Sequence, residues 1–81
     1  MQHQVEIKHI NIKIYGKVQA VFFRVTAKEK AEKLGITCSA RNEPDGSVYI
    51  EVEGEEGSLE EFVKWCHIGP PLAKVEKVEV S

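Results

Sequence analysis

Cysteine is scarce in this sequence, which has only Cys38 and Cys66 among its 81 residues. The pair fits neither a CxxC motif nor a zinc-binding spacing, so we expect two reduced thiols that pack as small hydrophobic side chains. A disulfide between them is the alternative, because the redox compartment usually decides pairing. The shortage of cysteine argues against a disulfide-stabilised scaffold and implies no metal centre.

Positive charge and long apolar runs are lacking as well. The formal net charge is −2, so there is no broad positive field to neutralise a nucleic-acid backbone. No stretch approaches the roughly 20 apolar residues that span a bilayer, and the polar start MQHQVEIKH lacks the layout of a signal peptide. We expect a cytoplasmic protein with no nucleic acid and no membrane as partner, which binds any anion locally.

The remaining composition is that of an ordinary globular protein. Hydrophobic residues make up 42% of the chain and charged residues 30%, which is far from the apolar-poor composition of a disordered segment. A chain of this length has room for one hydrophobic core and at most two layers. We therefore expect residues 1–81 to form a single domain, and we expect that domain to be a monomer.

Four segments show the alternation of apolar and polar residues that is typical of half-buried strands. The third segment is the most regular, whereas the fourth loses its alternation around Lys77, where a β-bulge would explain the break. The turn from Asn42 to Gly46 predicts a hairpin loop between the second and third segments. The apolar positions are Ile10, Ile12 and Ile14; Ile36, Cys38 and Ala40; Val48, Ile50 and Val52; and Val75, Val78 and Val80.

Two other segments carry apolar residues at helical spacing. The first helix should begin near Phe23 and end at Gly35, and the second should end at Gly69-Pro70-Pro71. Ser58 followed by Glu61 matches a capping box and predicts the start of the second helix. The apolar stripes consist of Phe23, Ala27, Ala31 and Leu34, and of Leu59, Phe62, Val63 and Cys66.

The order of these segments is strand, helix, strand, strand, helix, strand. Because the strands are apolar on one face and polar on the other, both helices should pack on the same face of one sheet. Right-handed crossovers then make the sheet antiparallel. We predict an α+β fold, a ferredoxin-like βαββαβ sandwich with a four-stranded antiparallel sheet and two helices on one face.

The junction between the first strand and the first helix, from Gly16 to Arg24, is a candidate anion site. Unpaired backbone N–H groups and the positive end of the helix dipole both favour negative charge there. Arg24 adds a guanidinium that can bond two phosphate oxygens at once, although a cation in a first helical turn is unfavourable by itself. The placement suggests an anionic partner. Alternatively, Arg24 points to solvent or pairs with Glu51 or Glu53.

The same junction resembles a known signature. The stretch Gly16-x-Val18-Gln19-Ala20-Val21-Phe22-Phe23-Arg24 is similar to the acylphosphatase motif GxVQGVxFR. Further matches follow in the family's order at Ala31-x-x-Leu34-Gly35-Ile36, Arg41-Asn42, Asp45-Gly46, Gly54, Phe62, and Gly69-Pro70 leading to Ala73-x-Val75. The chain therefore resembles the acylphosphatases, enzymes that hydrolyse carboxyl-phosphate anhydrides.

The resemblance implies a site as well as an activity. Arg24 would hold the phosphate of a small-molecule acyl phosphate, and Asn42 would orient the attacking water. Inorganic phosphate or sulfate would bind in the same loop, and no metal or cofactor is implied. Taken alone, Asn42 is more simply the first residue of a turn. The residues whose backbone amides are assigned to the substrate are Val18, Gln19, Ala20, Val21, Phe22 and Phe23.

Two departures from the family pattern bear on function. Ala20 stands where the signature has glycine, and its methyl group would cost about 1 to 2 kcal/mol in a left-handed conformation but little in an ordinary one. Cys38-Ser39-Ala40 replaces the usual Gly-Trp-Val, which predicts a more open or differently packed pocket wall. The alternative to an enzyme is therefore a module of the same fold that binds phosphate or an acyl phosphate without turnover.

RNA binding is a third hypothesis, because RNA-recognition modules share this order of strands and helices and stack bases on sheet aromatics. Tyr15 and Tyr49 are the only aromatic residues with outward strand parity. Glu51 and Glu53, beside Tyr49, would repel a phosphate backbone. The sequence therefore favours an enzyme over an RNA-binding domain.

Overall fold

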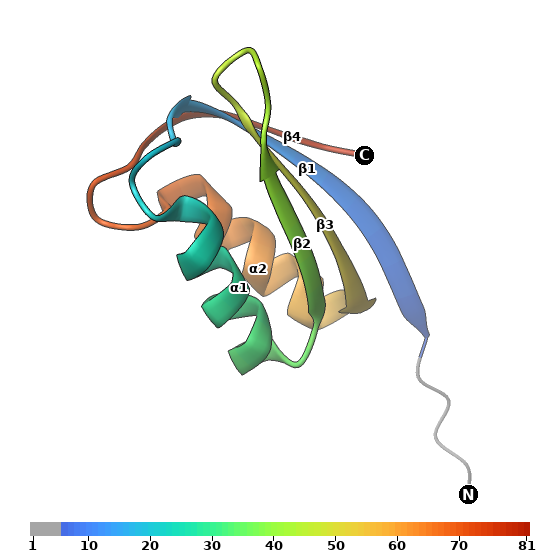
Figure 1. Ribbon diagram of the computed structural model, residues 1–81. Helices are drawn as coiled ribbons and strands as arrows, with labels where there is room; N and C mark the ends of the chain where they lie inside the picture. Colours follow the sequence, from blue (N-terminus) through green and yellow to red (C-terminus); the bar gives the residue numbers. More distant parts are fainter. Residues whose placement is uncertain (1–5) are drawn as a thin grey trace, which may run out of the picture.

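The strands and helices expected from the sequence are present in the computed structural model, which describes residues 6–81 (Figure 1). In chain order they are β1, Ile7–Lys17; α1, Phe23–Leu34; β2, Thr37–Asn42; β3, Val48–Glu55; α2, Glu56–Ile68; and β4, Lys74–Val80. β1 is longer than its alternation predicted, because it pairs with β3 from Ile7 and with β4 as far as Lys17. That residues 1–81 form one domain stays a prediction, since residues 1–5 lie outside the described residues.

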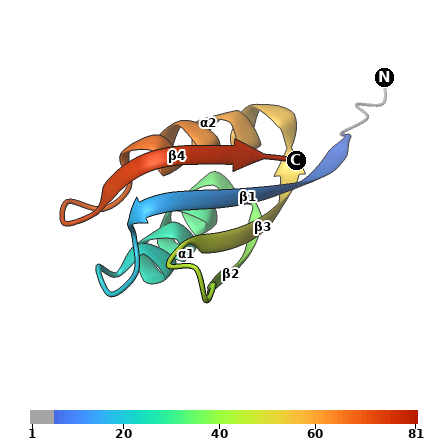
Figure 2. The same ribbon diagram turned by 90° about the horizontal axis from the view of Figure 1, so that it is seen from above.

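The strands form one antiparallel sheet in the order β2-β3-β1-β4. Both helices lie on the same side of this sheet, as Figure 2 shows from a second direction. The predicted α+β, ferredoxin-like βαββαβ fold is therefore confirmed. Across residues 6–81, neither helix has the length and apolar character needed to cross a membrane.

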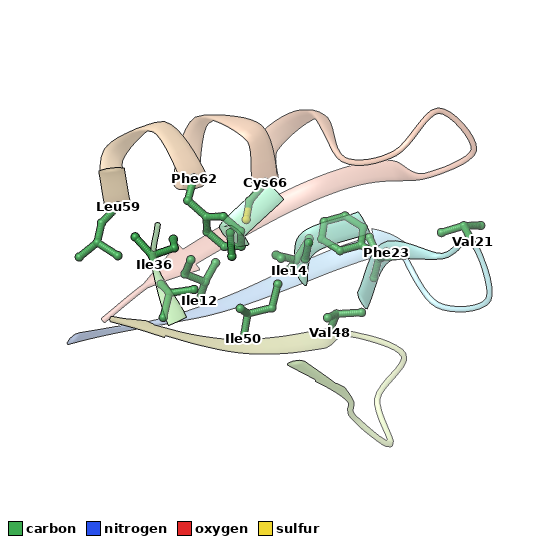
Figure 3. Packing of buried hydrophobic residues seen from close by; sticks show 14 residues of the cluster. Ile12, Ile14, Val21, Phe23, Ile36, Val48, Ile50, Leu59, Phe62 and Cys66 are labelled. Carbon is green, nitrogen blue, oxygen red and sulfur yellow. The ribbon is translucent and has the colours of Figure 1, made fainter. Parts of the chain in front are cut away.

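The hydrophobic core fills the space between the sheet and the helices (Figure 3). The strands and helices contribute the residues at the predicted spacings except Val80, which is 49% exposed and lies outside the core, and Phe62 and Cys66 are both 0% exposed. Burial raises the pKa of the Cys66 thiol far above its usual range. Cys38 is half-buried and both cysteines are free, which confirms the expected pair of reduced thiols. The fully buried strand residues are Ile12, Ile14, Val48, Ile50 and Val52.

The outer face of the sheet carries partnered side chains rather than a free stacking surface. The Arg41 guanidinium lies 4.5 Å from the centroid of the Tyr49 ring. The Tyr15 hydroxyl donates a hydrogen bond to Glu79 at 2.8 Å, and Lys77 Nζ lies 5.2 Å from the Tyr15 ring. Because both outward tyrosines already have charged partners, the structure gives no support to the RNA-binding hypothesis.

The start of α2 differs from the sequence prediction. The helix begins at Glu56, directly after β3, and its N-cap residue Glu55 is extended (φ −70°, ψ 148°) with no side-chain cap hydrogen bond. Ser58 lies inside the first helical turn, so the predicted capping box with Glu61 is wrong. The reason is that β3 continues to Glu55 through pairing with Ile7, which leaves no loop, and Glu56 supplies favourable negative charge at the helix start.

β4 contains the bulge that its broken alternation predicted. Tyr15 pairs with Lys77 and Gly16 pairs with Val75, so Glu76 has no partner on β1. Gly16 has φ 128°, and a Cβ atom there would overlap the backbone of β4. Bulges bend a strand and redirect it, and this one lies where β1 leaves the sheet for α1.

The connection between α2 and β4 packs against the start of α1 through Gly69. This residue has φ 70°, and a Cβ atom there would lie 2.7 Å from Phe23 Cε2 and 3.3 Å from Ala73 Cβ. Phe23 is 1% exposed, and its ring centroid lies 5.3 Å from that of Trp65. The first residue of α1 is therefore held in place by α2 and by the connection that follows it.

We expect Gly69→Ala to lower the free energy of unfolding by at least about 1 to 2 kcal/mol, because the left-handed backbone and the contact with Phe23 both penalise a methyl group. Gly57→Ala is the matched control. Gly57 lies in α2, where an added Cβ has open space around it, and the change should be neutral or stabilise by up to about 1 kcal/mol. Urea unfolding followed by circular dichroism measures both, and equal losses in the two variants would contradict this role for Gly69.

Candidate active site

The β1–α1 loop, residues 18–22, turns the chain from the centre of the sheet into α1. Ala20 (φ 58°) and Phe22 (φ 62°) are left-handed, and no other non-glycine residue between 6 and 81 has a positive φ. Turns that contain left-handed residues form concave nests in which successive N–H groups point toward an anion. Within the described chain, no N–H group of residues 18–23 donates to a backbone carbonyl. The loop therefore presents free donors at a helix N-terminus.

Buried side chains hold this loop in its unusual conformation. Val18 and Phe23 are 1% exposed and Val21 is 6% exposed, and Figure 3 shows Val21 in the loop at the end of the core where Phe23 lies. The Thr26 hydroxyl and N–H both donate to the Phe22 carbonyl oxygen, at 2.8 and 3.0 Å. A strained backbone persists only where its surroundings over-determine it, and here the core and the first turn of α1 do so.

Arg24 lies in the first turn of α1, exposed and next to the loop. Its pairing with Glu51 or Glu53, one of the alternatives from the sequence, is wrong. Those carboxylates lie near His9, at 3.5 Å from Nε2 and 3.7 Å from Nδ1 respectively, because their parity places them on the outer face of the sheet. In the part of the chain that the structure describes, no ion pair includes Arg24.

Arg24 and Asn42 line one pocket, with a volume of about 330 Å³. Asn42 is the last residue of β2, so the pocket lies between the β1–α1 loop, the first turn of α1 and the start of the β2–β3 hairpin loop. Phe22 and Val25 are 72% and 58% exposed and form an apolar rim. The other lining residues are Val18, Ala20 and Phe23.

Two of the loop residues assigned to the substrate do not line this pocket. Val21 points into the core, and Gln19, for which the sequence indicated only a backbone role, donates two side-chain hydrogen bonds to the β2–β3 hairpin. The one signal in the sequence was a polar side chain among apolar loop residues. Val25 was not predicted, because its position on α1 reads as an ordinary exposed helix residue.

The segment Cys38-Ser39-Ala40 lies along β2 and lines no part of the pocket. Ser39 is exposed, and Cys38 and Ala40 are half-buried beneath α1. That the pocket wall is more open or differently packed than in the family stays a prediction.

The hairpin that follows Asn42 is closed by Asp45. Its carboxylate accepts hydrogen bonds from the Ser47 hydroxyl and from the Ser47 N–H, the latter at 3.0 Å, and lies 3.1 Å from Lys13 Nζ. The bonds from Ser47, followed by the one from Lys13, lower the pKa of Asp45 to about 2. The carboxylate thus stabilises the hairpin only while it is ionised.

Fold and site together define a class of protein: a small α+β domain with a candidate anion site where the first strand meets the first helix. Comparison with known proteins gives the family. The acylphosphatase family model matches residues 10–81. An acylphosphatase from Rubrobacter xylanophilus is 48% identical over 81 residues, which cover 100% of this chain and 74% of the relative. An acylphosphatase from Thermococcus kodakarensis is 46% identical over 71 residues, which cover 88% of this chain and 78% of the relative.

Solved structures agree. An acylphosphatase from Coxiella burnetii superposes with a TM-score of 0.89 at 36% identity, covering 93% of this chain and 79% of that one. The acylphosphatase from Bacillus subtilis superposes with a TM-score of 0.88 at 33% identity, covering 94% of this chain and 83% of that one. The chain belongs to the acylphosphatase family, and it is accordingly an enzyme.

We expect Ala20→Gly to raise the free energy of unfolding by about 1 kcal/mol, because glycine removes the left-handed strain at only a partial entropic cost. Ala31→Gly is the control, since Ala31 is buried in regular helix α1 and the same change there should destabilise by roughly 1 kcal/mol. Denaturant unfolding checks that the free energy of unfolding rises in Ala20→Gly and falls in Ala31→Gly. A loss of stability in Ala20→Gly would contradict the claim that the left-handed backbone of Ala20 is strained.

The hairpin should weaken in acid. The pKa of Asp45 falls from its ordinary 3.8 to about 2 on folding, so its stabilising contribution is complete above pH 3.8 and is lost as the pH falls toward about 2. Asp45→Asn lacks that contribution at every pH. The difference in Tm between wild type and variant should therefore shrink across this window in thermal unfolding curves. A Tm difference that stays constant down to pH 2 would contradict the lowered pKa of Asp45.

Proposed function

We propose that this chain hydrolyses acyl phosphates, the mixed anhydrides of carboxylic and phosphoric acids, to a carboxylate and inorganic phosphate. The observation that carries the proposal is the one pocket that joins Arg24, the β1–α1 loop and Asn42. A cation and a set of backbone donors suit phosphoryl oxygens, and a neutral amide suits a water molecule. Membership of the acylphosphatase family supports the same reaction.

The phosphoryl group binds in the β1–α1 loop. Backbone amides of residues 18–23 donate hydrogen bonds to its oxygens, aided by the positive end of the α1 dipole. The planar guanidinium of Arg24 adds two parallel charge-assisted bonds. The absence of acidic residues from the first turn of α1 leaves this positive potential to the substrate. Inorganic phosphate, the product, and sulfate bind in the same loop.

Asn42 orients the attacking water. Its side-chain carbonyl accepts a hydrogen bond from water and its NH₂ group donates one, which fixes the direction of the lone pair without any change of charge. The water oxygen bonds to phosphorus as the bond from phosphorus to the acyl oxygen breaks. The electron pair leaves with the carboxylate, and the proton released by the water passes to the phosphate or to solvent.

This reaction asks for positioning and charge stabilisation rather than strong acid or base catalysis. A carboxylate is a weak base and departs without protonation, so a general acid adds little. Charge that develops on the equatorial phosphoryl oxygens in a loose transition state meets Arg24 and the loop amides. We propose that neither a metal nor a cofactor takes part, because Arg24, the loop amides and Asn42 already meet each requirement of the step.

A module that binds phosphate without turnover was the alternative, and it depended on Ala20. The left-handed conformation of Ala20 makes its methyl group costly, but the cost of about 1 to 2 kcal/mol amounts to roughly a tenfold rate effect for each 1.4 kcal/mol that appears in the transition state. Such a loss slows an enzyme without abolishing turnover. The family relationship supports turnover over binding alone.

We further propose that residues 1–81 act as a monomeric, single acylphosphatase-like domain in the cytoplasm. The single hydrophobic core of residues 6–81 supports one domain. Two free cysteines suit a reducing compartment.

Purified protein should hydrolyse benzoyl phosphate in the presence of a chelator. Arg24→Ala should lower kcat/KM by about 10²- to 10³-fold and weaken the binding of inorganic phosphate. Asn42→Ala should lower kcat by a similar factor while phosphate still binds, because Asn42 acts on the water. Absorbance assays and calorimetric titration with phosphate separate the two effects.

Lys28→Ala is the matched control for the lost charge. Lys28 is exposed one turn after Arg24 on α1, and its removal should change kcat/KM less than twofold. Full activity in Asn42→Ala, or no turnover in the wild type that Ala20→Gly restores, would sink the proposal of a working enzyme.

A further inference from the structure

The side chain of Gln19 does not line the pocket and reaches instead from the β1–α1 loop to the β2–β3 hairpin. Its Nε2 atom donates to the Glu43 carbonyl oxygen at 2.8 Å and to the Ser47 carbonyl oxygen at 2.9 Å, and both bonds are partly buried. The NH₂ group of glutamine has two protons, and both are used. Figure 1 shows the loop and the hairpin side by side at one end of the sheet.

The two acceptors lie at the two ends of the hairpin loop. The Glu43 N–H itself donates to the Ser47 carbonyl oxygen at 2.9 Å, and the Gly46 N–H donates to the Glu43 carbonyl oxygen at 3.1 Å. Asn42 directly precedes Glu43 and pairs with Val48, the residue directly after Ser47. The Gln19 side chain therefore bonds to Glu43 and Ser47, the two residues that adjoin the Asn42–Val48 pair.

Other attachments of the hairpin are weaker or lie on the outer face. Lys13 pairs with Asp45 at 3.1 Å, but the two side chains are 33% and 48% exposed, and exposed pairs contribute only about 0 to 1 kcal/mol. Arg41 contacts Tyr49 and Glu43 on the outer side of β2. The hydrogen bonds of Gln19 are the ones that join the hairpin to the loop that is proposed to hold the phosphate.

We propose that Gln19 is a positioning residue that sets Asn42 relative to the bound phosphoryl group. The proposal rests on the proposed function and adds to it a task for the Gln19 side chain, distinct from that of its backbone amide. The phosphoryl group is fixed by the loop and by Arg24, whereas the attacking water is fixed by Asn42 on another part of the chain. In-line attack needs these two parts in register, and a displacement of about 1 Å can cost 10²-fold in rate.

Gln19→Met tests this role, because methionine has a similar length and lacks both donors. The Glu43 and Ser47 carbonyl oxygens each keep a backbone hydrogen bond, so the hairpin loses its link to the loop but keeps its own closure. We expect kcat for benzoyl phosphate to fall about 10- to 100-fold, with the Kd for inorganic phosphate changed less than threefold. Lys13→Met is the control, which removes the outer attachment of the same hairpin and should change kcat less than twofold.

A double-mutant cycle with Asn42→Ala separates positioning from general damage. If Gln19 acts through Asn42, Gln19→Met should cost less than twofold in kcat once Asn42 is alanine. Equal fold losses in both backgrounds would overturn the proposal, and so would a loss of phosphate affinity that matches the loss of kcat. If Gln19→Met does not fold, Gln19→Leu, which also lacks both donors and adds no charge, replaces it in the cycle.

Hydrogen exchange provides a readout that does not depend on turnover. The Glu43 amide should exchange at least tenfold faster in Gln19→Met than in wild type, whereas amides in the middle of β3 keep their rates. Unchanged exchange at Glu43 would overturn the proposed hold on the hairpin even in an active enzyme. A wild type without turnover but with this exchange pattern would instead remove the proposed function and leave the contact in place.

Discussion

The turn from β1 into α1 is the constraint on which the rest of this structure depends. The chain must leave a central strand and enter a helix within a short loop, and it does so with Ala20 and Phe22 in left-handed conformations. These conformations are unfavourable for residues with a Cβ atom. They persist because Val18, Val21 and Phe23 are buried, so the hydrophobic core supplies the free energy that shapes the site.

The electrostatics of the site are local. The chain has a net charge of −2, so long-range attraction does not gather an anionic substrate. Positive potential instead comes from the start of α1, which has no acidic residue in its first turn, together with Arg24. Backbone amides cannot lose their donor protons and need no reorganisation when charge develops. The same geometry that strains the backbone therefore provides fixed dipoles where we propose that the phosphoryl group binds.

The site has two parts that come from different units of the fold. The β1–α1 loop and Arg24 form one part, and Asn42 at the end of β2 forms the other. β2 does not pair with β1, because β3 lies between them, so the sheet alone fixes the two parts only indirectly. The hydrogen bonds of Gln19 to the hairpin connect the two parts directly and explain how a small domain keeps them in register.

Alternating and helical spacings by themselves determined the strands, the helices, the side of the sheet that is buried and the bulge near Lys77, because apolar periodicity reports directly which faces leave water. The signature from Gly16 to Arg24 located the loop. Only the tertiary structure decided that β3 runs directly into α2, so that Ser58 does not cap the helix, and that Arg24 and Asn42 line one pocket. It also decided that Ala20 is left-handed and that Gln19 reaches the hairpin. These four results depend on pairing register and on contacts between segments distant in sequence, which no local pattern encodes.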